Sequence, residues 1–176
     1  MALRLKFIGV ALSALLSGTG LAGSAMSADD ARVVERDGKP DIALTAADDA
    51  PMRAAIAQAR TSVEEFIAAF ARPAARQRSF AVIVAVIDGR LIEQLWVDVE
   101  SYADGQFTGR IANDPYQVSN VRRGDRIVVD KERISDWMFV DRGHLVGGFT
   151  VRALRARLTD DERARFDSTL PFVIND

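Results

Sequence analysis

Two carboxylates are the side chains of this sequence best placed to do chemistry. Glu93 and Asp136 each lie within an otherwise apolar segment, where an ionised carboxylate needs a partner or a raised pKa. If neighbouring strands bring them together in an open cleft, they could serve as general acid and base or as a glycosidase-type pair. The alternative is structural: Arg152 neutralises Glu93, and Asp136 accepts backbone amides in its own turn. Such a buried ion pair would fix strand register more than it adds stability.

Two tryptophans offer a second kind of site. Trp96 and Trp137 could form an aromatic platform for a sugar or a peptide, with hydrogen bonds from Asn113 and Asp136. In the alternative interpretation both rings fill the ends of the hydrophobic core. Both interpretations stay open at the level of sequence.

The sequence contains few residues that could support other kinds of catalysis or a metal site. His144 is the one histidine, it follows a predicted turn, and we expect it to be an exposed loop residue. The chain has no cysteine, which excludes disulfides and thiol chemistry and makes a zinc site improbable. The sequence contains no G-x-S-x-G elbow, phosphate-binding loop or dinucleotide fingerprint. We therefore assign no catalytic residue and expect no metal or cofactor.

The first 28 residues have the order of a secretory signal peptide. Two basic residues, Arg4 and Lys6, precede an apolar run over residues 7–16, and small residues follow up to Ala28. The run is too short to span a bilayer comfortably, so we expect cleavage between residues 25 and 28 and no stable membrane span afterwards. Cleavage would leave 21 basic and 25 acidic residues, a balance that argues against a nucleic-acid partner. We expect a periplasmic or secreted protein.

Beyond this segment the patterns predict one α+β domain over residues 48–176, after a linker over residues 29–47. A helix should begin near Asp48-Asp49 and end at Pro73. Its apolar stripe consists of Met52, Ile56, Ala59, Val63, Phe66 and Phe70. We expect an antiparallel sheet of about five strands with this long helix packed on it. Two short C-terminal helices should follow, the first capped by Thr150 and the second by a capping box at residues 159–162.

A β-hairpin over residues 79–100 should form the centre of the sheet. Asp88-Gly89 favours a two-residue turn, which would pair Val84 with Glu93 and Val82 with Leu95. Alternation then places Glu93 on one face, together with Val82, Val84, Val86, Leu91, Leu95, Val97 and Val99. The other face carries Ala81, Ile83, Ala85, Gln94, Trp96 and Asp98. Residues 134–140 are either a strand, with Ile134 and Asp136 on one face and Trp137 on the other, or contain a helical turn at 135–137.

Five short motifs resemble the YegJ-like family, a bacterial domain of unknown function. They are Glu93-Gln-Leu-Trp96, Phe107-Thr-Gly109 with Asn113-Asp-Pro115, Gly124-Asp125, Ile134-Ser-Asp-Trp-Met138, and Gly147-Gly-Phe-Thr-Val-Arg152. The likeness covers roughly residues 48–172. The sequence departs from the family pattern at Gln94, where histidine is common, and at Ile83, where lysine is common. The resemblance implies a domain and no activity.

We therefore expect a non-catalytic binding or protein-interaction module that recognises a small ligand or an envelope protein. The predicted surface includes Trp96, Asn113, Asp136 and Trp137. The alternative is a hydrolase of cell-envelope glycan or peptide that uses Glu93 and Asp136. A third possibility, a small inhibitor or immunity-type protein, would show a flat apolar patch or an exposed sheet edge without a cleft.

Overall fold

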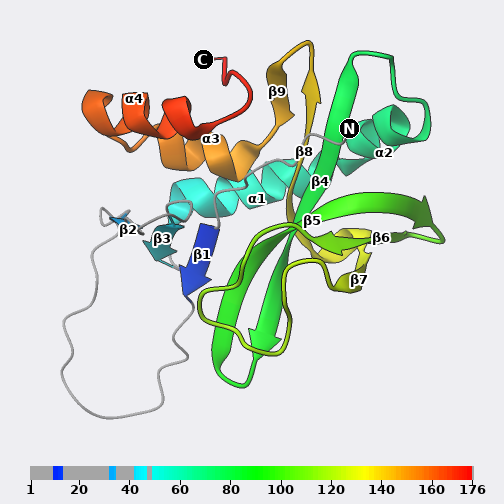
Figure 1. The fold of residues 1–176 in the computed structure, drawn as a ribbon, viewed down its shortest axis with the longest axis horizontal. Helices are drawn as coiled ribbons and strands as arrows, with labels where there is room; N and C mark the ends of the chain where they lie inside the picture. The colour runs from blue at the N-terminus through cyan, green and yellow to red at the C-terminus, as the bar shows by residue number, and fades with distance from the viewer. Residues whose placement is uncertain (1–9, 14–31, 35–41, 47–48, 176) are drawn as a thin grey trace.

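The computed structural model describes residues 10–13, 32–34, 42–46 and 49–175, and within this part four α-helices accompany a six-stranded sheet (Figure 1). The predicted α+β class is confirmed. The helices are α1 (Ala50–Thr61), α2 (Val63–Ala71), α3 (Phe149–Arg155) and α4 (Asp160–Thr169). The sheet strands are β4 (Gln77–Asp88), β5 (Leu91–Ala103), β6 (Gln106–Ile111), β7 (Arg126–Asp130), β8 (Ile134–Asp141) and β9 (His144–Gly147).

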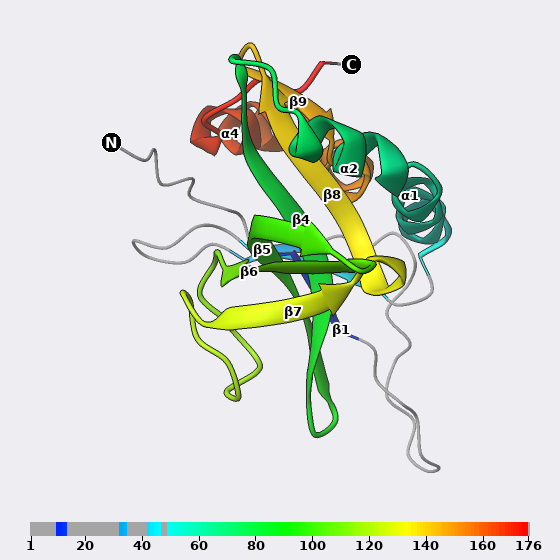
Figure 2. The ribbon, with the colours of Figure 1, turned by 90° about the vertical axis from the view of Figure 1, so that its right-hand side faces the viewer.

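The sheet has the order β7-β6-β5-β4-β8-β9, and every neighbouring pair is antiparallel. The sixth strand is β9, which follows the turn after Asp141 and forms an edge of the sheet. A 3-10 turn, Lys131–Arg133, joins β7 to β8. The long strands β4 and β5 form the centre, and their shared turn extends away from the helices (Figure 2).

The predicted N-terminal helix is two helices that meet at Ser62. Asp49 caps α1 by accepting the Met52 N–H at 3.2 Å, and Pro51 lies in the first turn, as the sequence predicts. At Ser62 the hydroxyl donates to the Gln58 carbonyl at 2.7 Å, and φ and ψ of −102° and 6° leave the helical region. The Gln58 carbonyl thus accepts both the N–H of Ser62, at 3.1 Å, and its hydroxyl at the break between the two helices.

The hairpin turn is Gly89-Arg90, not Asp88-Gly89, because Asp88 ends β4 and pairs with Leu91. Gly89 takes the left-handed conformation, with φ of 61°. The register is therefore shifted by two residues from the prediction, so that Glu93 faces Val86. Because side chains alternate with a period of two, a shift of two keeps every side chain on its predicted face.

Each face of the sheet is covered by its own hydrophobic cluster. On the face covered by α1 and α2 lie the buried residues Ala59, Val63, Phe66, Val82, Val84, Val86, Leu95, Val97, Phe107, Ile111, Val118, Val129, Ile134, Trp137 and Phe139. On the face covered by α3, α4 and the C-terminal segment lie Ala81, Ile83, Trp96, Ala112, Met138, Val140, Leu145, Val151, Leu154, Leu158, Phe166 and Ile174. Figure 2 shows β8 between α4 on one side and α1 and α2 on the other. We call these the α1–α2 face and the α3–α4 face.

Residues 134–140 form a strand whose register against β4 shifts twice, once between Arg78 and Ala81 and once between Ile83 and Val84. Ile83 pairs with Asp136 and Val84 with Ile134, so Ser135 is an extra residue, a β-bulge. The bulge moves Ile134 to the face of Trp137. The prediction that Ile134 shares a face with Asp136 was therefore wrong, whereas Met138 and Val140 lie on one face and Trp137 and Phe139 on the other, as predicted.

Three short strands precede the domain. They are β1 (Val10–Ser13), β2 (Arg32–Val34) and β3 (Ile42–Ala46), in the order β1-β3-β2, and β1 lies against β5. The basic start and the cleavage region of the expected signal peptide, residues 1–9 and 14–28, lie outside the described residues. Among the helices described, none is long and apolar enough to cross a membrane.

Candidate functional site

Three of the predicted binding residues lie in one row across the α3–α4 face. Trp96 pairs with Ile83 in the neighbouring strand, and Ile83 pairs with Asp136 on its other side. Asn113 extends the row, because its Oδ1 accepts the Trp96 backbone N–H at 2.8 Å. All four residues are buried. The row is therefore part of the interior and does not face solvent.

Asp136 caps a helix that begins far along the chain. One carboxylate oxygen accepts the N–H groups of Trp137 at 2.8 Å and Phe149 at 3.1 Å. The other accepts the N–H of Thr150 at 2.8 Å and its hydroxyl at 2.5 Å. Gly148 occupies the N-cap position of α3, so the expectation that Thr150 caps this helix was wrong. The carboxylate supplies the acceptor that the N-cap residue itself lacks.

The burial of Asp136 has an electrostatic consequence. Loss of solvent raises the pKa of this carboxyl group from 3.8 to about 6, although its hydrogen bonds to Thr150, Trp137 and Phe149 act in the opposite direction. The neighbouring strand presents Ile83, which supplies no charge. In the family pattern described above a lysine is common at this position, where it would face Asp136 directly.

Trp137 and Glu93 lie on the opposite face of the sheet. The indole N–H of Trp137 donates to the Ala59 carbonyl at 2.9 Å and to the Ser62 hydroxyl at 3.2 Å. Trp96 and Trp137 are 2 % and 1 % exposed and belong to different hydrophobic clusters. The structure thus brings Trp96, Asn113 and Asp136 together but separates them from the second tryptophan, so the four do not form one platform.

Glu93 binds backbone amides instead of an arginine. One oxygen accepts the N–H groups of Tyr116, Gln117 and Val118 at 2.9, 2.7 and 3.2 Å, and the other accepts the Tyr116 N–H at 2.8 Å. These three residues belong to the loop between β6 and β7. Because Glu93 and Asp136 face opposite sides of the sheet, the structure does not bring the two carboxylates into one cleft.

The proposed pairing of Arg152 with Glu93 is also not formed. The Arg152 guanidinium donates to the carbonyls of Gly147, Leu145 and Asn175, at 3.0, 2.9 and 2.5 Å. It lies on the α3–α4 face, where α3 is packed. A carboxylate on the other side of the sheet is out of its reach.

The loop between β6 and β7, whose backbone binds Glu93, is also hydrogen-bonded to the last residues of β4 beside the hairpin turn. The N–H and hydroxyl of Ser119 both donate to the Asp88 carboxylate at 2.8 Å, and the Asn120 amide donates to the Ile87 carbonyl at 2.8 Å. The backbone hydrogen bond from Ser119 lowers the pKa of Asp88. We call the loop over residues 112–125 the strap. Sequence reasoning did not identify the strap, although the polar Ser119 and Asn120 between Val118 and Val121 were a signal for it.

The strap and the hairpin together expose large apolar side chains. Ile87 is 55 % exposed, Leu91 44 % and Tyr116 52 %. Strand alternation puts Leu91 on the side of Glu93, beneath the strap, and Ile87 on the other side. We call these three residues the tip patch. In both ribbon views the hairpin end lies away from the helices (Figures 1 and 2).

No metal centre is formed in the described part of the chain, where no group of three or more histidine, aspartate or glutamate side chains converges. His144 is exposed, as predicted, but it is the first residue of strand β9 and not a loop residue, and its Nδ1 lies 3.0 Å from the Asn175 side-chain oxygen. Two buried polar atoms on the α3–α4 face, Gln94 Oε1 and Asn113 Nδ2, have no hydrogen-bond partner among the residues that the structure describes. Gln94 is the second departure from the family pattern.

Comparison with known proteins identifies relatives but no activity. A family model described as an uncharacterised protein conserved in bacteria (DUF2314) matches residues 49–172. The uncharacterised protein YegJ of Escherichia coli is 34% identical over 111 residues, which are 63% of this chain and 71% of YegJ. A putative ankyrin repeat protein of Neisseria meningitidis is 40% identical over 82 residues, which are 46% of this chain and only 32% of that protein. No solved structure matches the chain significantly.

Proposed function

We propose that the chain, which belongs to the DUF2314 family, is a non-catalytic protein-interaction module. Its contact surface in this proposal is the tip patch. The single observation behind this proposal is a set of exposed apolar side chains, Ile87, Leu91 and Tyr116, on a tightly held support. Large apolar side chains that are exposed at one end of a fold are typical of protein interaction sites, and here Leu91 and Ile87 lie on the two sides of the hairpin end.

The support for the tip patch is unusually well ordered for a surface loop. Three backbone N–H groups of the strap bind Glu93, and two more groups bind Asp88. A contact surface that is already ordered loses less conformational entropy when it binds. Tyr116 adds a ring that carries much contact area with few rotatable bonds.

The two candidate carboxylates favour binding over hydrolysis. Glu93 and Asp136 are buried, they lie on opposite faces, and backbone N–H groups occupy both. A general acid or base must reach a proton of the substrate, and neither group has an open path to one. We find no observation that favours a hydrolase.

One relative adds weak support. The Neisseria protein is named as a putative ankyrin repeat protein, and stacked repeats of that kind form extended binding surfaces. A relative of that name supports a role in recognition for this chain. We further propose that residues 1–28 are a signal peptide and that the partner is a protein of the cell envelope. Cleavage there would remove β1 and leave β2 paired with β3.

The test is retention of envelope proteins by the immobilised full domain. We compare the wild type with a Leu91→Asp/Tyr116→Asp double variant and with Val128→Asp. Val128 is 57 % exposed on β7, away from the hairpin end, and serves as the matched control. A protein retained by the wild type and by Val128→Asp but lost from the double variant supports the proposal. Equal retention by all three contradicts it.

A further inference from the structure

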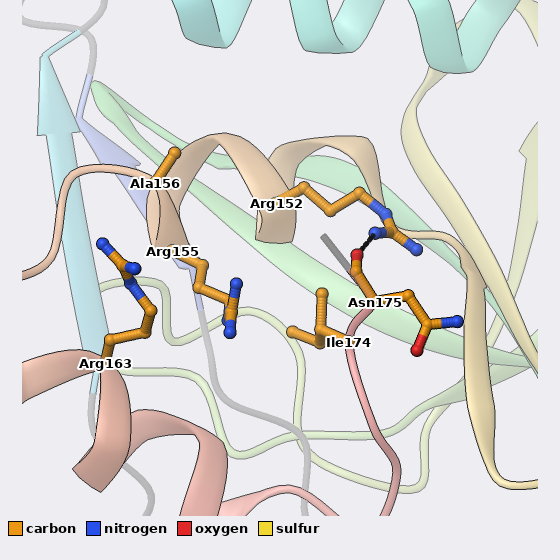
Figure 3. A pocket seen from close by; sticks show the side chains of 6 residues that line it. All are labelled: Arg152, Arg155, Ala156, Arg163, Ile174 and Asn175. Carbon is orange, nitrogen blue, oxygen red and sulfur yellow. Dashed lines mark hydrogen bonds between the residues drawn. The ribbon is translucent and has the colours of Figure 1, made fainter. Parts of the chain in front are cut away.

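A second site is formed on the α3–α4 face, where three arginines line a cavity of about 380 Å³. Arg152 and Arg155 come from α3 and Arg163 comes from α4, while Ile174 and Asn175 of the C-terminal segment close one side. Figure 3 shows Arg155 between Arg163 and Ile174, with Arg152 at the other end beside Asn175. The volume falls within the range of about 300–1,000 Å³ that small-molecule sites occupy.

Two of the three guanidinium groups are fixed in place by hydrogen bonds. Asp167 accepts two from Arg155, Nε to Oδ1 and Nη2 to Oδ2, both at 2.9 Å. Arg152 is held by the three carbonyls described above, and its bond to the Asn175 carbonyl is drawn in Figure 3. A preorganised arginine fork binds an oxyanion with less loss of side-chain entropy than a mobile lysine does.

Among the described residues, Arg163 has the fewest hydrogen-bond partners of the three arginines. Its Nη2 donates to the Leu158 carbonyl at 3.2 Å, and its Nη1 lies 3.7 Å from the carboxylate of Asp160, a residue whose side chain is almost fully exposed. Its Nε is buried and has no hydrogen-bond partner in the described part of the chain. A buried donor without an acceptor is costly, and a bound oxygen would remove that cost.

The charges on the cavity wall favour an anion. Three arginines face one close carboxylate, Asp167, and one distant, solvated carboxylate, Asp160. Arg152 has no carboxylate partner among the described residues and binds only carbonyl oxygens. Counting the described residues alone, the wall therefore carries an excess of positive charge beside the apolar surface of Ala156 and Ile174.

We propose that this cavity binds the phosphate group of a small molecule, with Arg163 as the principal contact and the neighbouring Arg155 as a second. Phosphate oxygens match the planar, multiply donating guanidinium, and a dianion offsets the excess charge. Ala156 and Ile174 would contact the organic part of the ligand. The site shares no residue with the tip patch, so it stands or falls independently of the proposed function.

The experiment is calorimetric titration of the purified full chain with inorganic phosphate, O-phosphoserine and acetate at pH 7.5 and low salt. The test variant is Arg163→Gln, with Arg163→Lys as a second variant that keeps the charge but loses the fork. The matched control is Arg126→Gln, which removes an exposed arginine of β7 that lies 3.8 Å from Glu100. Circular dichroism confirms that each variant is folded.

We expect the wild type to bind phosphate saturably and at least about tenfold more tightly than acetate. Arg163→Gln should weaken phosphate binding about tenfold or more, because the variant loses charge-assisted hydrogen bonds. Arg163→Lys should fall between that variant and the wild type, and Arg126→Gln should equal the wild type. Tighter binding of O-phosphoserine would indicate a phosphorylated metabolite, and equal binding would indicate free phosphate. No saturable binding, or equal weakening by Arg126→Gln, would overturn the proposal.

Discussion

Replacement of Glu93 by glutamine distinguishes a structural carboxylate from a catalytic one. Glu93 is 1 % exposed, and its Oε2 alone accepts three backbone N–H groups. Glutamine has the same shape and can keep its oxygen at that position. Its NH₂ group would then replace Oε1 and face the Tyr116 N–H, which now lies at 2.8 Å. Three charge-assisted hydrogen bonds become neutral and one contact becomes repulsive.

The expected loss of stability follows from these contacts. Hydrogen bonds to a charged group contribute about 1.5–3 kcal/mol and neutral ones about 1 kcal/mol, so three weakened bonds could cost several kcal/mol. Relief from burying an ionised group offsets part of this cost. We therefore expect Glu93→Gln to lower the free energy of unfolding by about 2 kcal/mol. Glu93→Ala should cost about 3–5 kcal/mol, because it leaves buried donors unpaired.

The assay is urea unfolding at pH 7, in which a loss of about 2 kcal/mol lowers the midpoint by about 1 M. Hydrogen exchange of the Tyr116, Gln117 and Val118 amides should accelerate in the same variant. The control is Glu100→Gln on the same strand, whose exposed pair with Arg110 should contribute less than about 1 kcal/mol. A catalytic carboxylate is often strained, so its removal often stabilises a protein. A Glu93→Gln variant that is as stable as the wild type, or more stable, would therefore refute the structural role of Glu93.

Three further predictions concern the interior. The pKa of Asp136 is 3.8 in the unfolded chain and about 6 in the fold, so its contribution to stability is complete below pH 3.8 and is lost as the pH rises through 6. Asp136→Asn should flatten the slope of unfolding free energy between pH 4 and 6, and an unchanged slope would count against the assignment. Both tryptophans should emit at short wavelength and resist acrylamide quenching in single variants, Trp96→Phe and Trp137→Phe, and a readily quenched signal would contradict their burial. Gly147→Ala should destabilise the fold by about 3 kcal/mol or more in thermal unfolding, because φ is +73° and the new Cβ would lie 2.4 Å from the Trp137 carbonyl oxygen. Gly143→Ala, with a similar φ of +86° and open space, should cost only about 1 kcal/mol, and equal losses would refute the steric argument.

The elements that local patterns control could be predicted from the sequence. The apolar stripe of α1 and α2 and the capping box of α4 follow from spacing along one segment, and both are present in the structure. The faces of the central hairpin also follow from alternation. The pairing register of the β4–β5 hairpin could not be predicted in this way. Asp88 accepts hydrogen bonds from Ser119, which is thirty-one residues away, and remains in the strand instead of entering the turn.

The long-range contacts of the site could not be predicted, for the same physical reason. Glu93 binds backbone N–H groups, and every residue except proline carries one, so no side-chain type marks the partner. Asp136 caps α3 across a gap of thirteen residues, whereas capping patterns in sequence extend over about three. Arg152 likewise binds carbonyls, which leave no compositional signal.

The most direct test of the protein-interaction proposal is site-specific photocrosslinking in cells that express the full chain. A photoreactive phenylalanine analogue replaces Tyr116 in one experiment and Val128 in another. We predict a discrete adduct with one envelope protein from position 116, its loss when Leu91→Asp is introduced into the same chain, and no such adduct from position 128. Adducts of the same pattern from both positions, or an adduct at 116 that Leu91→Asp leaves unchanged, would contradict the assignment of the tip patch as the contact surface.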